Sequence, residues 1–244
     1  MHKGGDLNHI TATVLAGGFG TRLRGVVSDR PKVLAQIGDK PFLSFIMNQL
    51  TTSGVKQVIL CTGYLSEQIE QLYGSQYGAL NITYSRETDP LGTAGAIRKA
   101  ADLFDSDFAL IMNGDSYCDA DLREFWHWHN RKQAEASILL CSVPDAMRYG
   151  RVKVGADDRV EAFEEKRPEH EEDWINAGVY IIKRDLIMTI PSEKKMSLEN
   201  EIFPTWIGRH FFGYQNGGRF LDIGIPEDYD EARDFFSSLN GDRG

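Results

Sequence analysis

The chain has 244 residues, of which 41% are hydrophobic and 26% charged, and its formal net charge at pH 7 is −9. A chain of this length can bury a substantial core and suits one large α/β domain over residues 1–244. The acidic balance argues against nucleic-acid and membrane partners, because both need a basic footprint. The start is polar without an apolar leader, and no apolar run approaches the roughly 18 residues of a spanning helix, so we expect a cytoplasmic protein.

Strands and helices alternate through the first part of the chain. The pattern predicts a strand at 10–16, a helix after Pro41, a strand at 57–62, a helix near 65–73, a strand near 82–84, a helix at 92–103, a strand at 108–112 and a helix around the tryptophans at 126 and 128. Such alternation predicts a mostly parallel sheet covered by helices on both faces, which is a three-layer arrangement.

After about residue 142 the pattern changes to short strands. They are predicted at 151–154, 160–164 and 175–182, before two more helical stretches. We therefore expect an inserted antiparallel portion, which makes the sheet mixed while the domain stays continuous.

A glycine-rich loop follows the first predicted strand. Gly17, Gly18 and Gly20 let backbone N–H groups crowd against an anion where a β-carbon would clash. Between Arg22 and Lys32 the chain carries a net charge of +3, opposite in sign to the whole protein. A solvated basic loop is the alternative, but interleaved glycines and cations favour a phosphate-binding loop. We expect Lys32 to be an exposed loop cation.

Two aspartates follow predicted strands. Asn113-Gly114-Asp115 follows the strand at 108–112, so Asp115 should emerge at the same sheet edge as Gly17. Asp222 stands two residues before Gly224. Ligands of open parallel sheets bind at the carboxyl ends of the strands. An aspartate there is more often a turn-former or helix cap, but two of them beside a phosphate loop suit Mg²⁺, which needs few protein ligands.

Histidine and cysteine add little chemistry. His127 and His129 are two positions apart, so on a helix they point to different faces and cannot easily share a metal. We interpret them as surface or packing residues. Cys61, Cys118 and Cys141 are odd in number and widely spaced, which suits small buried hydrophobes in a reducing compartment.

Six ordered blocks of the sequence resemble the sugar-phosphate nucleotidyltransferases, which join a nucleoside triphosphate to a sugar 1-phosphate and release pyrophosphate. The blocks are 15–22 with Pro31-Lys32, 90–94, 113–115, 163–166, 176–180 and 222–224. The resemblance implies a Rossmann-like fold of the nucleotide-diphospho-sugar transferase type. It also implies a nucleotide-binding half at about 8–142, a sugar-phosphate-binding half at about 143–240, and Mg²⁺ as cofactor.

The resemblance further implies a role for each matching position. Catalysis would rest on Arg22, Lys32 and Asp115, and the metal would be held by Asp115 and Asp222. The nucleotide would be bound by Leu15, Ala16, Gly17, Gly18, Gly20, Thr21, Arg22, Gly92, Thr93 and Asp115. The sugar phosphate would be bound by Gly114, Gly150, Glu165, Lys166 and Asn176.

The chemistry of the reaction matches this set of residues. A sugar phosphate is largely doubly ionised at neutral pH, with a second pKa of about 6, so it needs no general base. The obstacle is repulsion between two polyanions, which clustered cations and Mg²⁺ would offset. We therefore expect catalysis by positioning and electrostatics, without a serine or cysteine nucleophile.

The segment at 20–29 is similar to guanylyltransferases that act on D-glycero-α-D-manno-heptose 1-phosphate. This favours GTP and that heptose phosphate as substrates, giving GDP-heptose for surface polysaccharide. A hexose 1-phosphate of mannose or glucose, with GTP, UTP or dTTP, stays open, as does a homo-oligomer. Since the chain ends soon after the Asp222 block, we expect no added acyltransferase or β-helix domain.

Three rival functions are weaker. A glycosyltransferase could use Asp119 and Asp121 as an Asp-x-Asp metal motif, but both lie at the start of a predicted helix, where acids act as caps. A non-catalytic nucleotide or sugar-phosphate sensor is disfavoured because Lys32, Asp115 and Asp222 are all present. A dinucleotide dehydrogenase would need a third glycine that the loop lacks.

Overall fold

The structure is a computed structural model that describes residues 6–18, 20, 29–144, 146–164 and 173–241. Thr21, Arg22, Glu165 and Lys166, which carry predicted roles, lie outside the described residues. Among the described residues, no helix is long and apolar enough to cross a membrane.

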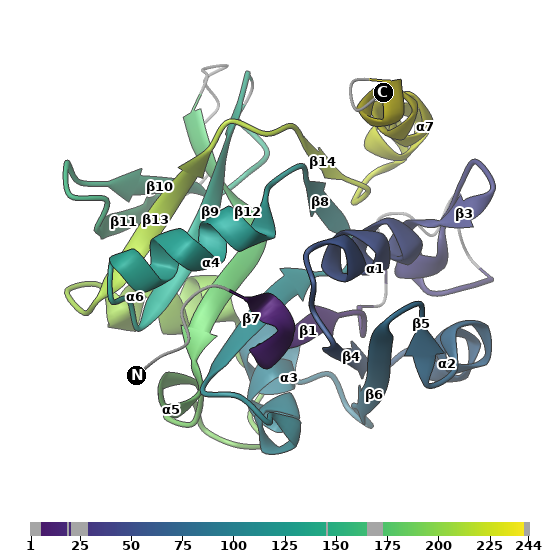
Figure 1. Cartoon of the computed structure of the whole chain (residues 1–244), viewed down its shortest axis with the longest axis horizontal. Coiled ribbons are helices and arrows are strands. Elements are labelled where there is room, and N and C mark those ends of the chain that lie inside the picture. Colours follow the sequence, from purple (N-terminus) through teal and green to yellow (C-terminus); the bar gives the residue numbers. More distant parts are fainter. Residues whose placement is uncertain (1–5, 19, 21–28, 145, 165–172, 242–244) are drawn as a thin grey trace.

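A ten-stranded mixed sheet forms the middle of the protein (Figure 1), in the order β11-β10-β12-β7-β1-β4-β6-β5, with β9 beside β12 and β13 beside β9. Its parallel centre consists of β7 (Phe108–Asn113), β1 (Thr11–Leu15), β4 (Gln57–Thr62) and β6 (Leu80–Arg86). The remaining strands are β5 (Gln76–Tyr77), β9 (Ala136–Val143), β10 (Arg151–Val154), β11 (Val160–Glu164), β12 (Asp173–Lys183) and β13 (Phe211–Asn216). The predicted mixed, mostly parallel α/β fold is confirmed.

The antiparallel portion begins at β12, which runs antiparallel to β7, β9 and β10 and carries β9 on the side opposite β7 and β10. Because β12 runs against β7, its residues around 176–179 arrive at the edge where β7 ends, with Val179 opposite Met112. The register of β12 on β9 shifts between Asn176 and Tyr180, so the strand bulges there. A predicted sugar-binding residue, Asn176, thus stands at the bulge.

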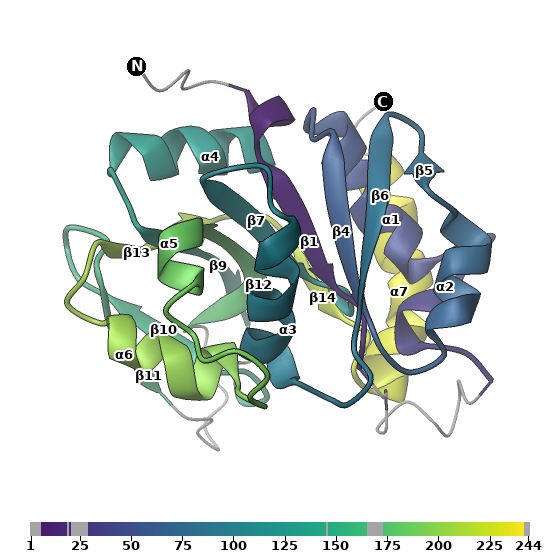
Figure 2. The ribbon, with the colours of Figure 1, turned by 90° about the horizontal axis from the view of Figure 1, so that it is seen from below.

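Helices cover both faces of the sheet, as the alternating pattern predicts (Figure 2). They are α1 (Phe42–Thr52), α2 (Ser66–Tyr73), α3 (Gly92–Ala100), α4 (Leu122–Arg131), α5 (Arg184–Ile187), α6 (Phe203–Trp206) and α7 (Pro226–Gly241). Side chains alternate between two cores: Leu110 and Met112 of β7 join the core beneath α1, α4 and α7, while Ala109 and Ile111 join the core beneath α3 and α6. Three layers result.

Helix α1 illustrates why the sequence folds locally as it does. Pro41 precedes its first residue with φ −63°, a value already suited to a helix start, and Gly54 follows its end with φ +89°. The apolar residues between them recur at helical spacing, and Phe42, Ile46 and Leu50 are all fully buried. The amphipathic stripe therefore decides which face of α1 meets the sheet.

Short elements complete the fold and differ most from prediction. Besides the hairpin of β2 (Gln36–Ile37) and β3 (Lys40–Pro41), they are the 3₁₀ turns η1 (Leu7–His9), η2 (Lys32–Leu34) and η3 (Ala101–Leu103), the π-helical turn η4 (Leu198–Ile202), and the ribbon of β8 (Ser116–Cys118) and β14 (Phe220–Asp222). The helix predicted at 92–103 is α-helical only to Ala100 and ends in η3.

Candidate active site

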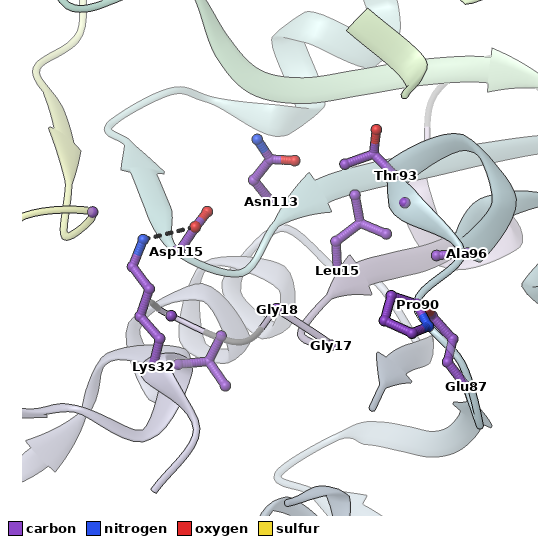
Figure 3. A pocket seen from close by; sticks show the side chains of 14 residues that line it. Leu15, Gly17, Gly18, Lys32, Glu87, Pro90, Thr93, Ala96, Asn113 and Asp115 are labelled. Atoms are coloured by element: carbon purple, nitrogen blue, oxygen red, sulfur yellow. Dashed lines mark hydrogen bonds and ion pairs between the residues drawn. The ribbon is translucent and has the colours of Figure 1, made fainter. Parts of the chain in front are cut away.

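The carboxyl ends of the parallel strands surround a cavity of about 360 Å³ (Figure 3). It is lined by Leu15, Gly17, Gly18, Gly20, Lys32, Val33, Glu87, Pro90, Gly92, Thr93, Ala96, Asn113, Asp115 and Gly224. Eight of the predicted site residues are in this set: Leu15, Gly17, Gly18, Gly20, Lys32, Gly92, Thr93 and Asp115. The cavity therefore lies where open parallel sheets bind their ligands.

Lys32 reaches into the cavity between two carboxylates. Its Nζ donates to Asp115 Oδ2 at 2.8 Å and lies 3.8 Å from Asp222 Oδ1. The two aspartates come together because β8 and β14 pair antiparallel, with Asp222 opposite Ser116. A segment more than 100 residues further along the chain thereby joins the end of β7, as the shared-edge argument predicted.

The prediction that Lys32 is an exposed cation is wrong. Its side chain is only 9% exposed, while the carboxylates of Asp115 and Asp222 are 44% and 31% exposed. Lys32 begins the 3₁₀ turn η2 directly after Pro31, and this turn directs the side chain inward along the loop. The two carboxylates supply the opposite charges that offset the cost of burying an ammonium group.

At two positions of the site, neighbouring atoms lie so close to the backbone that only glycine fits. Gly20 has φ +57°, and a β-carbon there would lie 3.0 Å from Lys32 Cβ. A β-carbon on Gly114 would lie 2.5 Å from the Leu15 carbonyl oxygen, which accepts the Gly114 N–H at 2.9 Å. The glycines let the loop and the end of β7 pack against Lys32 and β1 respectively.

Ala16, a predicted nucleotide-binding residue, lies beneath the loop rather than in the cavity lining. It is 1% exposed, its side chain belongs to the core, and its N–H donates to the Cys61 carbonyl at 2.8 Å. Its structural contribution is to hold the base of the glycine loop against β4.

A chain of hydrogen bonds joins Thr93 to Asn176. Thr93 Oγ1 donates to Glu199 Oε2 at 2.8 Å, Tyr180 Oη donates to Glu199 Oε1 at 3.1 Å, and Asn176 Nδ2 donates to Tyr180 Oη at 2.9 Å. Burial raises the pKa of Tyr180 well above its usual value, which keeps the phenol protonated as a donor. The network couples a predicted nucleotide residue to a predicted sugar residue.

Gly150 adjoins the same region, because its carbonyl accepts the Asn176 N–H at 3.3 Å. Asn176 Oδ1 in turn accepts the Gly178 N–H at 2.8 Å, which fixes the amide orientation. The side chain of Asn113 lines the cavity nearby, and its buried Oδ1 has no hydrogen-bond partner among the described residues. A polar atom left this way at a cavity wall is suited to a ligand donor.

Glu87 is a site residue that the sequence analysis missed. It follows β6 directly, its N–H donates to the Thr62 carbonyl at 2.8 Å, and its Oε2 accepts the Leu91 N–H at 2.8 Å. Burial raises the pKa of Glu87, against a lowering by the Leu91 N–H and Lys99. The strand was predicted to end near residue 84, so the rule of inspecting residues directly after strands did not reach Glu87.

The second aspartate of the Asp-x-Asp motif caps a helix. Asp121 Oδ1 accepts the N–H groups of Arg123 and Glu124 at 2.9 and 3.2 Å, at the start of α4. Asp119 and Asp121 line a different cavity from Asp115. This arrangement removes the main support for the glycosyltransferase alternative.

Comparison with known sequences decides the family. The profile described as nucleotidyl transferase matches residues 11–238. The chain belongs to the nucleotidyl transferase family. The matched range contains the glycine loop, the residues that line the cavity and both paired aspartates.

Two similar proteins of the nucleotidyl transferase family are named for the sugar phosphates on which they act. The D-glycero-α-D-manno-heptose 1-phosphate guanylyltransferase of Aneurinibacillus thermoaerophilus is 40% identical over 223 residues, covering 91% of this chain and 96% of that protein. The mannose-1-phosphate guanylyltransferase of Mycobacterium tuberculosis is 34% identical over 226 residues, covering 91% of this chain and 63% of that longer protein.

Solved structures agree on the fold. HddC from Yersinia pseudotuberculosis superposes with a TM-score of 0.83 at 33% identity, covering 93% of this chain and 99% of HddC. A second crystal structure of HddC, complexed with GMP-PN, gives the same TM-score at 32% identity. This nucleotidyl transferase therefore has the Rossmann-like fold of these neighbours.

Proposed function

We propose that this nucleotidyl transferase joins GTP and D-glycero-α-D-manno-heptose 1-phosphate to give GDP-heptose and pyrophosphate. The observation that carries the reaction class is the Lys32 ammonium between Asp115 and Asp222 at one end of the cavity. The heptose and guanine assignments are supported by the relative from Aneurinibacillus thermoaerophilus, whose length the match covers almost completely. Mannose 1-phosphate is the second candidate sugar, supported by the 34% identical guanylyltransferase.

The proposed reaction needs little proton chemistry from the protein. The sugar phosphate arrives already ionised, so one of its oxygens attacks the α-phosphorus while pyrophosphate leaves with the electron pair of the broken P–O bond. Two unit charges 4 Å apart repel by about 4 kcal/mol at an effective dielectric near 20. Lys32 would offset the charge that builds at the α-phosphate.

The aspartate pair fits Mg²⁺. Two hard carboxylates already converge on one cation, the Lys32 ammonium. In the described part of the chain, no group of three or more His, Cys, Asp or Glu side chains gathers around a common point. A site with two protein carboxylates suits Mg²⁺, which keeps water and takes phosphate oxygens. Asp115 and Asp222 would hold the ion, whose chemistry is to neutralise phosphate charge.

The remaining roles are assigned on the family resemblance. Arg22 and Thr21 would bind the triphosphate, with Arg22 on the departing pyrophosphate, while Glu165 and Lys166 would contact the sugar hydroxyls and the sugar phosphate. Asn176, Gly150 and Gly114 would border the sugar. The bulge of β12 beside the end of β7 supports this side of the cavity for the sugar phosphate.

We place the reaction in the cytoplasm, as a supply of activated sugar for polysaccharide. Cys61, Cys118 and Cys141 are all free and buried, which suits a reducing compartment. The partners are then two small anionic substrates, and association between copies of the chain stays a proposal that sedimentation would test.

A pyrophosphate-release assay tests the proposal. GTP, UTP and dTTP are each paired with the heptose, mannose and glucose 1-phosphates, with Mg²⁺ present. The expected result is fastest release with GTP and the heptose phosphate, and loss of release in the Lys32→Ala variant. Release with none of the pairs, together with tight nucleotide binding, would favour the sensor alternative instead.

A further inference from the structure

The connecting segment 146–150, between β9 and β10, contacts two sides of the candidate site. On one side, the Gly150 carbonyl accepts the Asn176 N–H of β12 at 3.3 Å. On the other side, the Tyr149 ring meets Phe220 of β14 edge-on, with ring centroids 5.4 Å apart. Since β14 ends in a proposed metal ligand, the connecting segment joins the sugar side of the site to the metal side.

An ion pair attaches the connecting segment to α7. Arg148 Nη2 donates to both carboxylate oxygens of Asp228, at 2.8 Å to Oδ1 and 3.0 Å to Oδ2. The Asp228 side chain is 16% exposed, whereas that of Arg148 is 43% exposed. The guanidinium carbon of Arg148 also lies 5.7 Å from the centroid of the Tyr149 ring, which is a cation–π distance. Asp228 belongs to the first turn of α7, the helix that follows β14 (Figure 1).

The start of α7 is a suitable anchor because the turn before it is bonded to the aspartate pair. Asp222 Oδ1 accepts the Gly224 N–H at 2.6 Å, and the Ile223 N–H donates to the Asp115 carbonyl at 3.0 Å. A carboxylate in the first turn of a helix is also favoured by the helix dipole. The ion pair therefore attaches the connecting segment to a part of the chain whose position is fixed relative to the proposed metal ligands.

We propose that Arg148 is a positioning residue of the reaction. Its ion pair with Asp228 holds the connecting segment in place, so that the Gly150 carbonyl stays against Asn176 on the sugar side. In this assignment Arg148 acts through the segment and does not itself contact the substrate. The inference rests on the proposed function, and it adds two residues that lie outside the six blocks of family resemblance.

A double-mutant cycle tests this assignment, because it measures whether two residues act through one interaction. kcat and both KM values are determined with GTP and the heptose 1-phosphate for the wild type, Arg148→Gln, Asp228→Asn and the double variant. Glu227→Gln is the matched control, since it removes a carboxylate from an exposed position in the same first turn of α7. The control therefore reproduces the loss of helix-dipole charge without breaking the ion pair.

Each single variant should raise KM for the sugar phosphate roughly three- to fivefold, which is the size of effect that a partly exposed ion pair can supply. KM for GTP should change little, because the connecting segment lies on the sugar side. The double variant should be no worse than the single variants, since the second change removes the partner of a bond that is already broken. Glu227→Gln should keep the wild-type constants.

Other patterns of KM would overturn the inference. A higher KM for the sugar phosphate in Arg148→Gln alone, with Asp228→Asn unchanged, would mean that Arg148 contacts the substrate directly. Additive effects in the double variant would show that the two side chains act independently. Equal increases in both KM values would indicate a general structural role instead of a role on the sugar side.

Hydrogen exchange without substrates separates this inference from the proposed function. Both ion-pair variants should speed amide exchange at Tyr149 and Asn176, whose N–H groups bond to carbonyls of the connecting segment, and the control should not. Unchanged exchange would overturn the inference even in an active enzyme. If the wild type releases no pyrophosphate with any pair, the proposed reaction fails and the positioning role fails with it, whereas faster exchange would still show that the ion pair holds the segment.

Discussion

Lys32 and His129 are both nearly buried side chains that can carry positive charge, but their surroundings differ. Lys32 is 9% exposed and lies between the carboxylates of Asp115 and Asp222. His129 is 1% exposed on α4, its Nδ1 is 2.8 Å from Ser137 Oγ, and its ring stacks on Trp126 and meets Phe108 edge-on. One group is buried among opposite charges, and the other among rings and a hydroxyl.

This difference in surroundings distinguishes a residue of the candidate site, Lys32, from a residue of the core, His129. The two carboxylates beside Lys32 offset the desolvation of a cationic side chain at the cavity wall, where a phosphate could meet it. Burial without counter-charge lowers the pKa of His129 to about 3, so the ring is neutral and serves packing. Of the two roles predicted for this histidine, surface or packing, its burial confirms packing.

The largest effect is expected from Lys32→Ala. Removing the ammonium withdraws charge from the α-phosphate, so kcat should fall by roughly 10²- to 10³-fold. Lys32→Arg is the control that keeps a positive charge at the position and should lose less. Steady-state pyrophosphate release gives the rates, and circular dichroism checks the fold. A Lys32→Ala protein with wild-type kcat would contradict the assignment of this region as a catalytic site.

The next effect is expected from Asp115→Asn and Asp222→Asn. Each change removes one of the two anionic oxygen ligands proposed for Mg²⁺, so the Mg²⁺ concentration at half-maximal rate should rise roughly tenfold or more. Asp121→Asn is the matched control, since asparagine also caps helices well. An unchanged magnesium titration for either cavity aspartate would remove that residue from the metal site.

Local signals in the sequence explain which parts of the fold were predicted. The strand at 57–62 was predicted with the bounds of β4, because an apolar run stands between polar turns. No strand was predicted for β9, whose first six residues are all buried, so its sequence lacks the alternation of a half-exposed strand. β13 begins with buried aromatics and a glycine, which indicate a strand only weakly.

The residues of the candidate site also fall into those with a local sequence signal and those without one. Asp115 could be predicted because a carboxylate soon after a strand is a local pattern. Glu87 follows the same pattern, but it was missed because the strand before it was predicted to end near residue 84, and β6 ends at Arg86. Glu199 had no such signal, because its hydrogen bond to Thr93 joins residues 106 positions apart. Networks of this kind exist only after the chain has folded.

A smaller effect is expected from Tyr180→Phe. The change removes the hydroxyl between Asn176 and Glu199, so KM for the sugar phosphate should rise roughly fivefold, while KM for GTP changes less. Tyr77→Phe is the control, since the hydroxyl of Tyr77 on β5 donates to Asn48 Oδ1 of α1 at the surface. Equal shifts in both KM values would show that the network supports the cavity generally and is not specific to the sugar side.

The smallest effect on activity, and a distinct one on stability, is expected at His129. Its folded pKa of about 3 lies below the ordinary 6.5, so protons bind the unfolded chain preferentially between these values. The stabilising contribution is complete above pH 6.5 and is lost as pH falls toward 3, with about 2 kcal/mol gone at pH 5.

Denaturant unfolding of His129→Phe at pH 7.5 and pH 5 measures this contribution. The variant should lose less stability than the wild type between the two pH values, because phenylalanine cannot take up a proton in the unfolded chain. His127→Phe is the matched control and should retain the wild-type pH dependence, since His127 is only partly buried on the same helix. An identical pH slope in His129→Phe and wild type would mean that His129 has the same pKa in the folded and the unfolded protein. That result would make the α4 region resemble the Lys32 region, with a counter-charge near the ring, and would end the contrast between them.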